Sequence, residues 1–220
     1  MTTLLLPSSG RRERRSAELR DRLFQAALQL FARKGYSETT VEDITNAADV
    51  GKGTFFNYFP SKEHILAAFG EMQIAKVQAA ADAAPTTGMP IRDFLHKLAT
   101  EVIADPARSP AVVRALLQAN LSSEPVRKVM RDIHIRASAF LARIIEVGQQ
   151  RGEIRGDLQA LVIAQTIRQS LLGAMLIWSL YGDGSLESRV EIVLKILWGG
   201  IAARGDFSTP GVSLVEGKSL

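Results

Sequence analysis

The sequence predicts an all-α protein with about nine helices. Apolar residues recur at helical spacing through most of its 220 residues, and no stretch shows the strict alternation of a β-strand. Pro90, Pro110 and Pro125 each stand where a helix can begin, because the first helical turn does not use the N–H that proline lacks. A chain of this length can bury the cores of one small and one larger domain.

The first helix is predicted over residues 16–34. Its apolar stripe ends at the cations Arg33 and Lys34, which favour the carboxyl end of a helix. Gly35 follows and can adopt the left-handed conformation that ends many helices. We therefore expect this helix to stop at Lys34.

Two short helices are then expected over residues 41–48 and 52–58. Thr39 or Thr40 can cap the first of them, and an acidic residue in its first turn can complete a capping box. Pro60 ends the second, because the residue before a proline is pushed out of helical geometry. Two short helices joined by a tight turn form a helix-turn-helix motif.

The second short helix carries an unusual mixture of side chains. Residues 52–58 include a lysine, a glycine, a threonine, an asparagine and three aromatic residues. A helix that serves only a core has no use for this mixture, whereas a DNA groove offers phosphates, base edges and thymine methyl groups together. The composition therefore indicates a helix that lies in a DNA groove.

Many positions around this motif agree with one family pattern in a single register. They fall within residues 17–66 and are Ala27, Leu30, Phe31, Gly35, Tyr36, Thr39, Thr40, Val41, Asp43, Ile44, Ala48, Val50, Gly53, Thr54, Tyr58, Phe59, Ser61, Lys62 and Glu63. With these residues the chain resembles the TetR family of transcriptional regulators. Gly51 departs from the family's usual serine and Phe56 from its common tyrosine, and each change removes a hydroxyl that can reach a phosphate.

The resemblance implies which residues of the motif contact DNA. Tyr58 and Lys62 lie where the family contacts phosphates. Thr54 and Phe55 can meet thymine methyl groups, and Asn57 can reach an adenine edge or a phosphate. The full set of candidate DNA contacts is Thr39, Thr40, Lys52, Gly53, Thr54, Phe55, Asn57, Tyr58 and Lys62.

Six further helices are expected after the motif. The fourth should be capped by Ser61 and run to about Ala83, and the next three should begin at the three prolines. Asp157 is expected to cap the eighth helix. Ser185 is expected to cap the ninth, which should end near Arg204.

These elements divide the chain into four parts. We expect a flexible basic arm over residues 1–15, a helix-turn-helix DNA-binding domain over 16–62, an effector-binding and dimerisation domain over 63–204, and a mobile tail over 205–220. The arm holds four arginines between residues 11 and 15. It can lie along DNA or remain a solvated tail, and both interpretations stay open.

The last two helices are apolar nearly all round, so they are either central in a core or shared with a partner. The resemblance implies that they pair with their copies across a two-fold axis in a homodimer, and an ordinary core pair is the alternative. Small residues in both helices would let them approach closely. The expected interface residues are Leu171, Gly173, Ala174, Met175, Val190, Leu194, Leu197 and Gly199.

The resemblance also implies an effector cavity enclosed by the fourth to eighth helices. The candidate lining residues, each alone equally consistent with a plain core, are Phe69, Met72, Phe94, Leu98, Leu117, Met130, Ile133, His134 and Trp178. As a group they indicate a small, mostly apolar, uncharged or weakly polar effector. In the family mechanism the effector tilts the fourth helix and moves two recognition helices out of successive major grooves, about 34 Å apart. Effector and pseudo-palindromic operator DNA then bind antagonistically, as expected of a repressor.

Composition narrows the setting in which the protein works. It has no cysteine, which excludes a disulfide framework and fits a reducing cytoplasm. The apolar run at residues 4–6 is too short for a secretory signal, and arginines follow it instead of preceding it. No uninterrupted apolar run approaches the roughly 18 residues of a membrane span. We therefore expect a cytoplasmic protein without a membrane partner.

Catalytic and metal-binding patterns are weak in this sequence. Residues 51–54 lack the earlier glycine of a phosphate-binding loop, because position 46 is an asparagine. Asp93 and His96 can share a helix face, but with no cysteine or second histidine nearby a solvated pair is favoured over a metal site. The sequence predicts no enzyme activity, no cofactor and no metal. The alternative function is a helical small-molecule-binding or adaptor protein that does not bind DNA.

Overall fold

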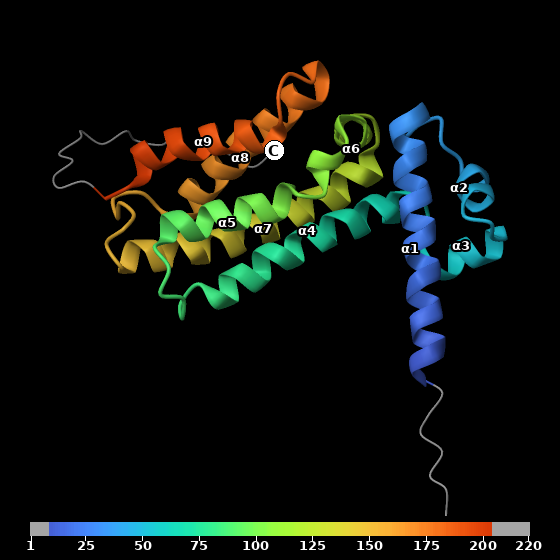
Figure 1. The fold of residues 1–220 in the computed structure, drawn as a ribbon, viewed down its shortest axis with the longest axis horizontal. Coiled ribbons are helices and arrows are strands. Elements are labelled where there is room, and N and C mark those ends of the chain that lie inside the picture. The colour runs from blue at the N-terminus through green and yellow to red at the C-terminus, as the bar shows by residue number, and fades with distance from the viewer. Residues whose placement is uncertain (1–8, 204–220) are drawn as a thin grey trace, which may run out of the picture.

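The computed structural model describes residues 9–203, and within them the chain is all-helical (Figure 1). Nine α-helices and one 3₁₀ helix occur in this part of the chain: α1 (Ser9–Lys34), α2 (Val41–Ala47), α3 (Lys52–Tyr58), α4 (Glu63–Ala83), α5 (Ile91–Ile103), η1 (Pro106–Arg108), α6 (Pro110–Ser122), α7 (Glu124–Gln150), α8 (Ala160–Tyr181) and α9 (Leu186–Ile201). The all-α prediction is confirmed. The predicted tail over 205–220 lies outside the described residues.

Most helix ends follow the predicted signals. α1 ends at Lys34, and Gly35 has a φ of +84°. Ser185 caps α9 as predicted, through a side-chain hydrogen bond to a backbone N–H group. α6 and α7 begin at or next to the predicted prolines, and Ser109 and Ser123, which were not among the predicted caps, cap them in the same way. These signals are local, so the sequence alone predicts them well.

The amino end of α1 differs from the prediction. α1 begins at Ser9 instead of residue 16, so the described part of the expected flexible arm is helical. Arg14 and Arg15 lie exposed on this first part of the helix. Arg14 and Arg15 are therefore carried on an amino-terminal extension of α1, over residues 9–15.

Two predicted caps are wrong because the side chains bind elsewhere. Asp157 accepts a hydrogen bond from Nε of Arg155 at 2.6 Å, and α8 starts only at Ala160. The hydroxyl of Ser61 contacts the side chains of Glu63 and His64 instead of capping the backbone of α4.

The helices form two groups that meet at α1. In Figure 1, α1 stands across the end of the molecule with α2 and α3 on its outer side, while α4, α5 and α7 run side by side away from it. α7 packs against both α4 and α8, and α8 packs against α9. Gly70 permits the close approach of α4 and α7, since a Cβ atom there would lie 2.6 Å from Cδ1 of Ile133.

A single apolar cluster holds the helix-turn-helix region against the rest of the chain. We call it the first core cluster; its buried members are Leu23, Phe24, Ala27, Leu28, Phe31, Tyr36, Ile44, Ala48, Phe55, Phe59, Ile65, Leu66, Phe69, Ala115, Ala119 and Val126. Ala115 and Ala119 belong to α6 and Val126 to α7. The core therefore crosses the predicted domain boundary after residue 62.

α8 is far less buried than its composition suggests. By length and mean hydropathy (1.5) it could cross a membrane, yet only 22% of that apolar window is buried within the chain. The large apolar side chains that it and α9 leave exposed are Leu161, Leu172, Leu176, Ile177, Leu180, Tyr181, Ile192 and Ile196. We call these residues the α8–α9 apolar surface.

Candidate DNA-binding surface and effector cavity

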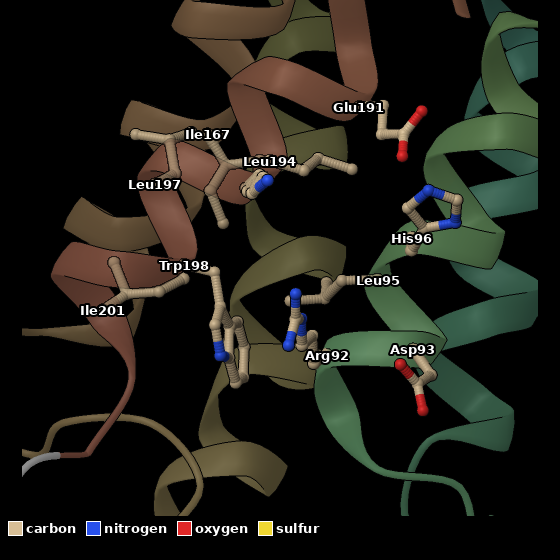
Figure 2. Close-up of a pocket in the computed structure, with 11 residues that line it drawn as sticks. Arg92, Asp93, Leu95, His96, Ile167, Glu191, Leu194, Leu197, Trp198 and Ile201 are labelled. Atoms are coloured by element: carbon tan, nitrogen blue, oxygen red, sulfur yellow. The ribbon is translucent and has the colours of Figure 1, made fainter. Parts of the chain in front are cut away.

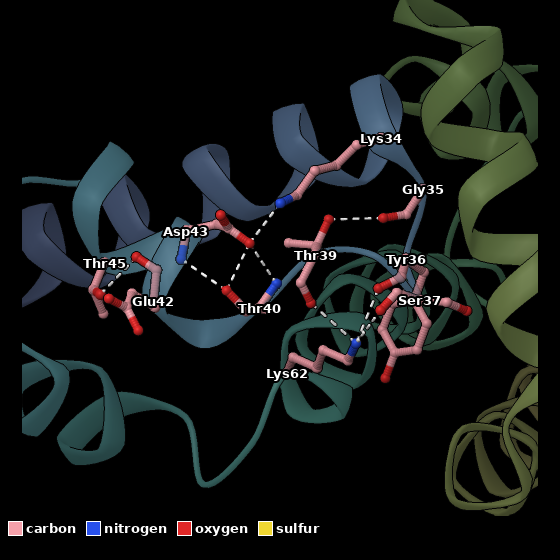
Figure 3. A network of polar contacts seen from close by, with 10 residues as sticks. All are labelled: Lys34, Gly35, Tyr36, Ser37, Thr39, Thr40, Glu42, Asp43, Thr45 and Lys62. Atoms are coloured by element: carbon pink, nitrogen blue, oxygen red, sulfur yellow. Dashed lines mark hydrogen bonds and ion pairs between the residues drawn. The ribbon is translucent and has the colours of Figure 1, made fainter.

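The amino end of α2 is fixed by a capping box. The Thr40 hydroxyl accepts a hydrogen bond from the Asp43 N–H at 3.1 Å, and the Thr40 N–H donates to the Asp43 carboxylate at 2.7 Å (Figure 3). Lys34 donates to the same carboxylate at 2.6 Å. Hydrogen bonds from Lys34 and then from Thr40 hold the pKa of Asp43 well below its usual range. The predicted capping box is confirmed, with Thr40 and Asp43 as its members.

Thr39 is not available to DNA. Its side chain is fully buried, and its hydroxyl donates a 2.7 Å hydrogen bond to the Gly35 carbonyl. The prediction that Thr39 contacts DNA is therefore wrong: the hydroxyl closes the turn after α1. Thr40 is exposed at the amino end of α2 and remains a candidate contact.

Lys62 joins the start of α4 to the turn after α1. Its ammonium group donates to the backbone carbonyls of Tyr36 and Thr39 at 3.0 Å and of Ser37 at 3.3 Å (Figure 3). It also lies 4.4 Å from the centre of the Tyr36 ring. These three carbonyls occupy all three N–H donors of the ammonium group. Lys62 is thus built into the fold rather than left free for a phosphate.

A second link joins the same two segments. The Tyr36 hydroxyl donates to the Glu63 carboxylate at 2.8 Å. Burial, together with this bond to Glu63, raises the pKa of Tyr36 far above its usual value. Burial acts to raise the pKa of Glu63, but hydrogen bonds from Ser61 and Tyr36 outweigh burial and lower it. α4 is therefore tied to the helix-turn-helix region by both Lys62 and Glu63.

α3 turns a different aromatic residue outward from the one expected. Phe55 is fully buried, and its ring centre lies 5.9 Å from that of Phe59 in the first core cluster. The prediction that Phe55 meets thymine methyl groups is wrong, because the core occupies that side of the helix. Phe56 is 53% exposed and takes the outward position. The four-residue spacing of Phe55 and Phe59 was the signal that could have shown this.

The other predicted contacts of α3 lie on its accessible side. Lys52, Gly53 and Asn57 are exposed, while Thr54 and Tyr58 are partly exposed. Lys52 forms a 2.9 Å ion pair with Glu42 in which both side chains are largely in solvent. Such a pair contributes little and can open when a phosphate approaches.

The carboxyl end of α3 contacts α1 just after its amino-terminal extension. The Tyr58 hydroxyl lies 3.2 Å from the Ser16 hydroxyl. This contact places the arginine-bearing start of α1 next to the accessible side of α3.

A cavity of about 270 Å³ lies among α4, α5, α6, α7, α8 and α9. It is lined almost wholly by apolar side chains. Six of the nine residues predicted to line a cavity do so: Phe69, Leu98, Leu117, Met130, Ile133 and His134.

Three predicted cavity residues lie elsewhere. Met72 is 40% exposed on α4, and Phe94 packs beside buried residues of α5 and α7. Trp178 is buried among residues of α5, α6 and α9, and its indole N–H donates to the Gly184 carbonyl at 3.2 Å. For these three the ordinary core or surface interpretation holds, because helical periodicity does not reveal which neighbour a side chain meets.

The predicted dimer residues fall into two groups. Gly173 and Gly199 are exposed and Ala174 is partly exposed. The larger side chains, in contrast, are wholly or partly buried against their own chain: Leu171, Met175, Val190, Leu194 and Leu197. Val190 in particular is a core residue, so its assignment to the interface is wrong. None of the residues of the exposed α8–α9 apolar surface was among the predicted interface residues.

A second pocket lies between α5 and α9 (Figure 2). Asp93 and His96 of α5 line it together with Glu191 and Trp198 of α9. Among residues 9–203, no group of three or more acidic, histidine or cysteine side chains is placed to hold a metal ion.

Comparisons with known proteins agree with this geometry. A family model described as bacterial regulatory proteins of the tetR family matches residues 23–69, which span most of the first core cluster. The HTH-type transcriptional repressor DhaR of Mycobacterium sp. (strain GP1) is 30% identical over 164 residues, covering 72% of this chain and 81% of DhaR. The regulator TcmR of Streptomyces glaucescens is 46% identical over 56 residues, covering 26% of this chain and 25% of TcmR.

A solved structure extends the likeness to the whole fold. It is the crystal structure of Thermus thermophilus FadR, a TetR-family transcriptional repressor in complex with lauroyl-CoA. It is 27% identical, covers 87% of this chain and 99% of the FadR chain, and has a TM-score of 0.63. The chain therefore belongs to the TetR family of bacterial transcriptional regulators.

Proposed function

We propose that this regulator is a cytoplasmic repressor without enzyme activity, which binds a pseudo-palindromic operator as a homodimer and leaves it when a small, mostly apolar effector fills the α4–α9 cavity. The observation that carries the proposal is the outward side of α3. It presents Lys52, Gly53, Phe56 and Asn57 to solvent on a helix that is otherwise anchored in the core. A cation, an amide, an aromatic ring and open backbone together suit a DNA groove.

The glycines before and within α3 support close approach to a duplex. A Cβ atom on Gly51 or Gly53 would meet no other atom within 4 Å, so both positions are open. Their backbone N–H groups lie at the start of α3, where helix N–H groups lack partners and can bind phosphate oxygens.

The α8–α9 apolar surface supports the homodimer. Crystal structures of this family are dimeric, and one half-site alone offers a helix-turn-helix few contacts. A second copy can cover Leu176, Ile177, Ile192 and Ile196, which would otherwise face water. The same cover accounts for the membrane-like composition of α8 in a DNA-binding protein.

The cavity shares side chains with the DNA-binding region, and this supports effector control. Phe69 of α4 lines the cavity and also stacks on Phe24 of α1, with ring centres 6.3 Å apart. Leu116 and Met130 likewise line the cavity and pack against the first core cluster. We expect an effector that displaces Phe69 to shift α4 or α1, and the hydrogen bonds of Lys62 connect α4 to the turn before α2.

Selection from a random duplex pool with the purified protein tests the DNA-binding function. We expect enrichment of a two-fold symmetric sequence and a binding constant that falls steeply with salt. Asn57→Ala should cost about 1–3 kcal/mol at one base-pair position in each half-site if Asn57 reads a base. A uniform loss across operator variants would mark Asn57 as a phosphate contact.

The same experiment discriminates the alternative function. A small-molecule-binding or adaptor protein without DNA function would enrich no sequence and would show only weak binding that does not depend on sequence. Glu38→Gln, an exposed change in the turn before α2, serves as the control that should leave operator choice unchanged.

A further inference from the structure

The apolar cavity has one charged residue in its lining. Arg168 of α8 stands there among apolar side chains, with His134 of α7 beside it. A guanidinium group is costly to hold next to apolar surface unless an anion accompanies it. The lining of the cavity therefore favours an occupant that carries a negative charge.

Within residues 9–203, the hydrogen-bond partners of Arg168 are all neutral groups. Its guanidinium donates to the His134 carbonyl at 2.7 Å and to the Ser138 hydroxyl, and it contacts Nδ1 of His134. Among the ion pairs of the described residues, none involves Arg168. Burial lowers the pKa of Arg168, and burial followed by the charge of Arg168 lowers the pKa of His134. Positive charge is thus disfavoured here until an anion arrives.

A polar groove adjoins the cavity at this point. The groove has a volume of about 580 Å³, and it shares Asn120, His134, Arg168 and Leu172 with the cavity lining. Arg168 therefore stands between an apolar chamber and an open groove.

The groove is basic and has no acidic residue in its lining. Arg127 and Arg131 line it together with Arg168. Arg127 donates to the Leu121 carbonyl at 2.8 Å, and Arg131 is exposed. The acid nearest to Arg131 in sequence, Asp132, interacts with Arg136, which is paired with Glu71. Three arginines thus face one groove without a carboxylate to neutralise them.

We propose that the effector is an amphipathic anion whose apolar chain fills the cavity and whose carboxylate or phosphate group lies in the groove on Arg168 and Arg131. This inference rests on the proposed effector function and names its ligand class. Arginine suits such a head group, because its planar guanidinium can donate two parallel hydrogen bonds to a carboxylate or phosphate. An anion there would also offset the charge that Arg168 holds beside apolar side chains.

Binding of matched twelve-carbon compounds to the full-length protein tests the inference. Dodecanoate, dodecanoyl-CoA and dodecanol are titrated by calorimetry below their micelle concentrations. At least one of the two anions should bind more tightly than dodecanol by about tenfold or more, as expected for a charge-assisted hydrogen bond. Preference for dodecanoate indicates a carboxylate site, and preference for the thioester indicates a phosphate site.

Arg131→Gln is the informative variant, because Arg131 is exposed and its loss should leave the fold intact. It should weaken the preferred anion about five- to twentyfold and leave dodecanol unchanged. Lys128→Gln removes the same charge from an exposed position of α7 outside the groove lining and should change neither affinity. Equal binding of anion and alcohol, equal effects of the two variants, or binding of none of the three compounds would overturn the inference.

Operator release separates this inference from the proposed function. If dodecanol displaces operator DNA as well as the anions do, the protein is effector-controlled but the anion site is wrong. If the anions bind through Arg131 and the operator stays bound, the anion site stands and the repressor mechanism is wrong. Release by the preferred anion alone, lost in Arg131→Gln, supports both.

Discussion

The helix-turn-helix region and the α8–α9 pair use their side chains in opposite ways. In the helix-turn-helix region, polar groups form hydrogen bonds within the fold: Thr39, Thr40 and Lys62 all bind backbone groups. In the second, apolar groups are left over: Ile192 and Ile196 of α9 face solvent. A functional surface is therefore recognised by the side chains that the core does not need, which are Lys52 and Asn57 on α3 and the exposed aliphatic side chains on α8 and α9.

The largest expected effect comes from charging the unused apolar surface. Ile196 is 70% exposed, so Ile196→Glu should leave the single chain folded. Two-fold symmetry would bury two of these carboxylates in the interface, one from each subunit. This should weaken dimerisation by about 3–5 kcal/mol. Light scattering should show a monomer with an unchanged helical circular-dichroism spectrum, and operator binding should fall steeply.

Leu121→Glu on α6 is the matched control for that variant. Leu121 is 80% exposed and lies outside α8 and α9, so its charge should not disturb the dimer. Leu194 and Leu197 are poorer positions for the test, because both pack against their own chain. If Ile196→Glu stays dimeric, the interface lies on another face.

Two adjacent aromatic residues of α3 sharpen the comparison within the first region. Phe55→Ala should lower the free energy of unfolding by about 3–4 kcal/mol, because it empties a fully buried site. Phe56→Ala should change stability by less than about 1 kcal/mol and instead weaken operator binding. Urea unfolding and fluorescence anisotropy measure the two quantities, and the opposite pattern would show that the orientation of α3 is wrong.

Lys62 and Lys52 separate a structural cation from a DNA-binding one. Lys62→Met removes the hydrogen-bond donor of three backbone carbonyls. This should lower the free energy of unfolding by about 1.5–3 kcal/mol. Lys52→Gln should leave stability unchanged and reduce the salt slope of operator binding by about 0.9. If Lys62→Met is as stable as the parent protein but shows a reduced salt slope of operator binding, Lys62 contacts a phosphate, as predicted from the sequence.

The smallest effect is expected where the effector cavity meets the helix-turn-helix region. Phe69→Leu keeps an apolar side chain in the cavity wall but loses the stacked contact with Phe24. The coupling between effector and operator should fall by about 0.5–2 kcal/mol, while operator affinity without effector changes little. Titrating operator release with the preferred ligand measures the coupling, and unchanged coupling would remove Phe69 from the transmission route.

Sequence reasoning succeeded where the deciding interaction is local. Gly35, the Thr40–Asp43 box and the Ser185 cap each involve residues within a few positions of one another. The phase of a helix is harder to assign. α3 has three aromatic residues within four positions, and the four-residue spacing of Phe55 and Phe59 is a weak sequence signal for the one that points inward, which the core around Phe55 confirms.

The same limit explains the errors in α8 and α9. These helices are apolar nearly all round, so periodicity does not separate Leu194, which packs inward, from Ile196, which does not. Arg168 was missed for a related reason. A single arginine in an apolar helix forms no sequence pattern that predicts its role. The role becomes clear only from the residues of α7 that it contacts.

The first core cluster also bears on how this protein can be re-engineered. Since Ala115 and Ala119 of α6 complete the packing around α1, the DNA-reading part is not a detachable module. A chimera that grafts residues 9–62 onto the effector domain of another regulator would need small residues at the matching positions of its α6. The exchange of DNA-binding regions between relatives should therefore succeed only where α1 and α6 pack well together. Changing only the exposed side chains of α3 is a safer way to obtain a new operator specificity.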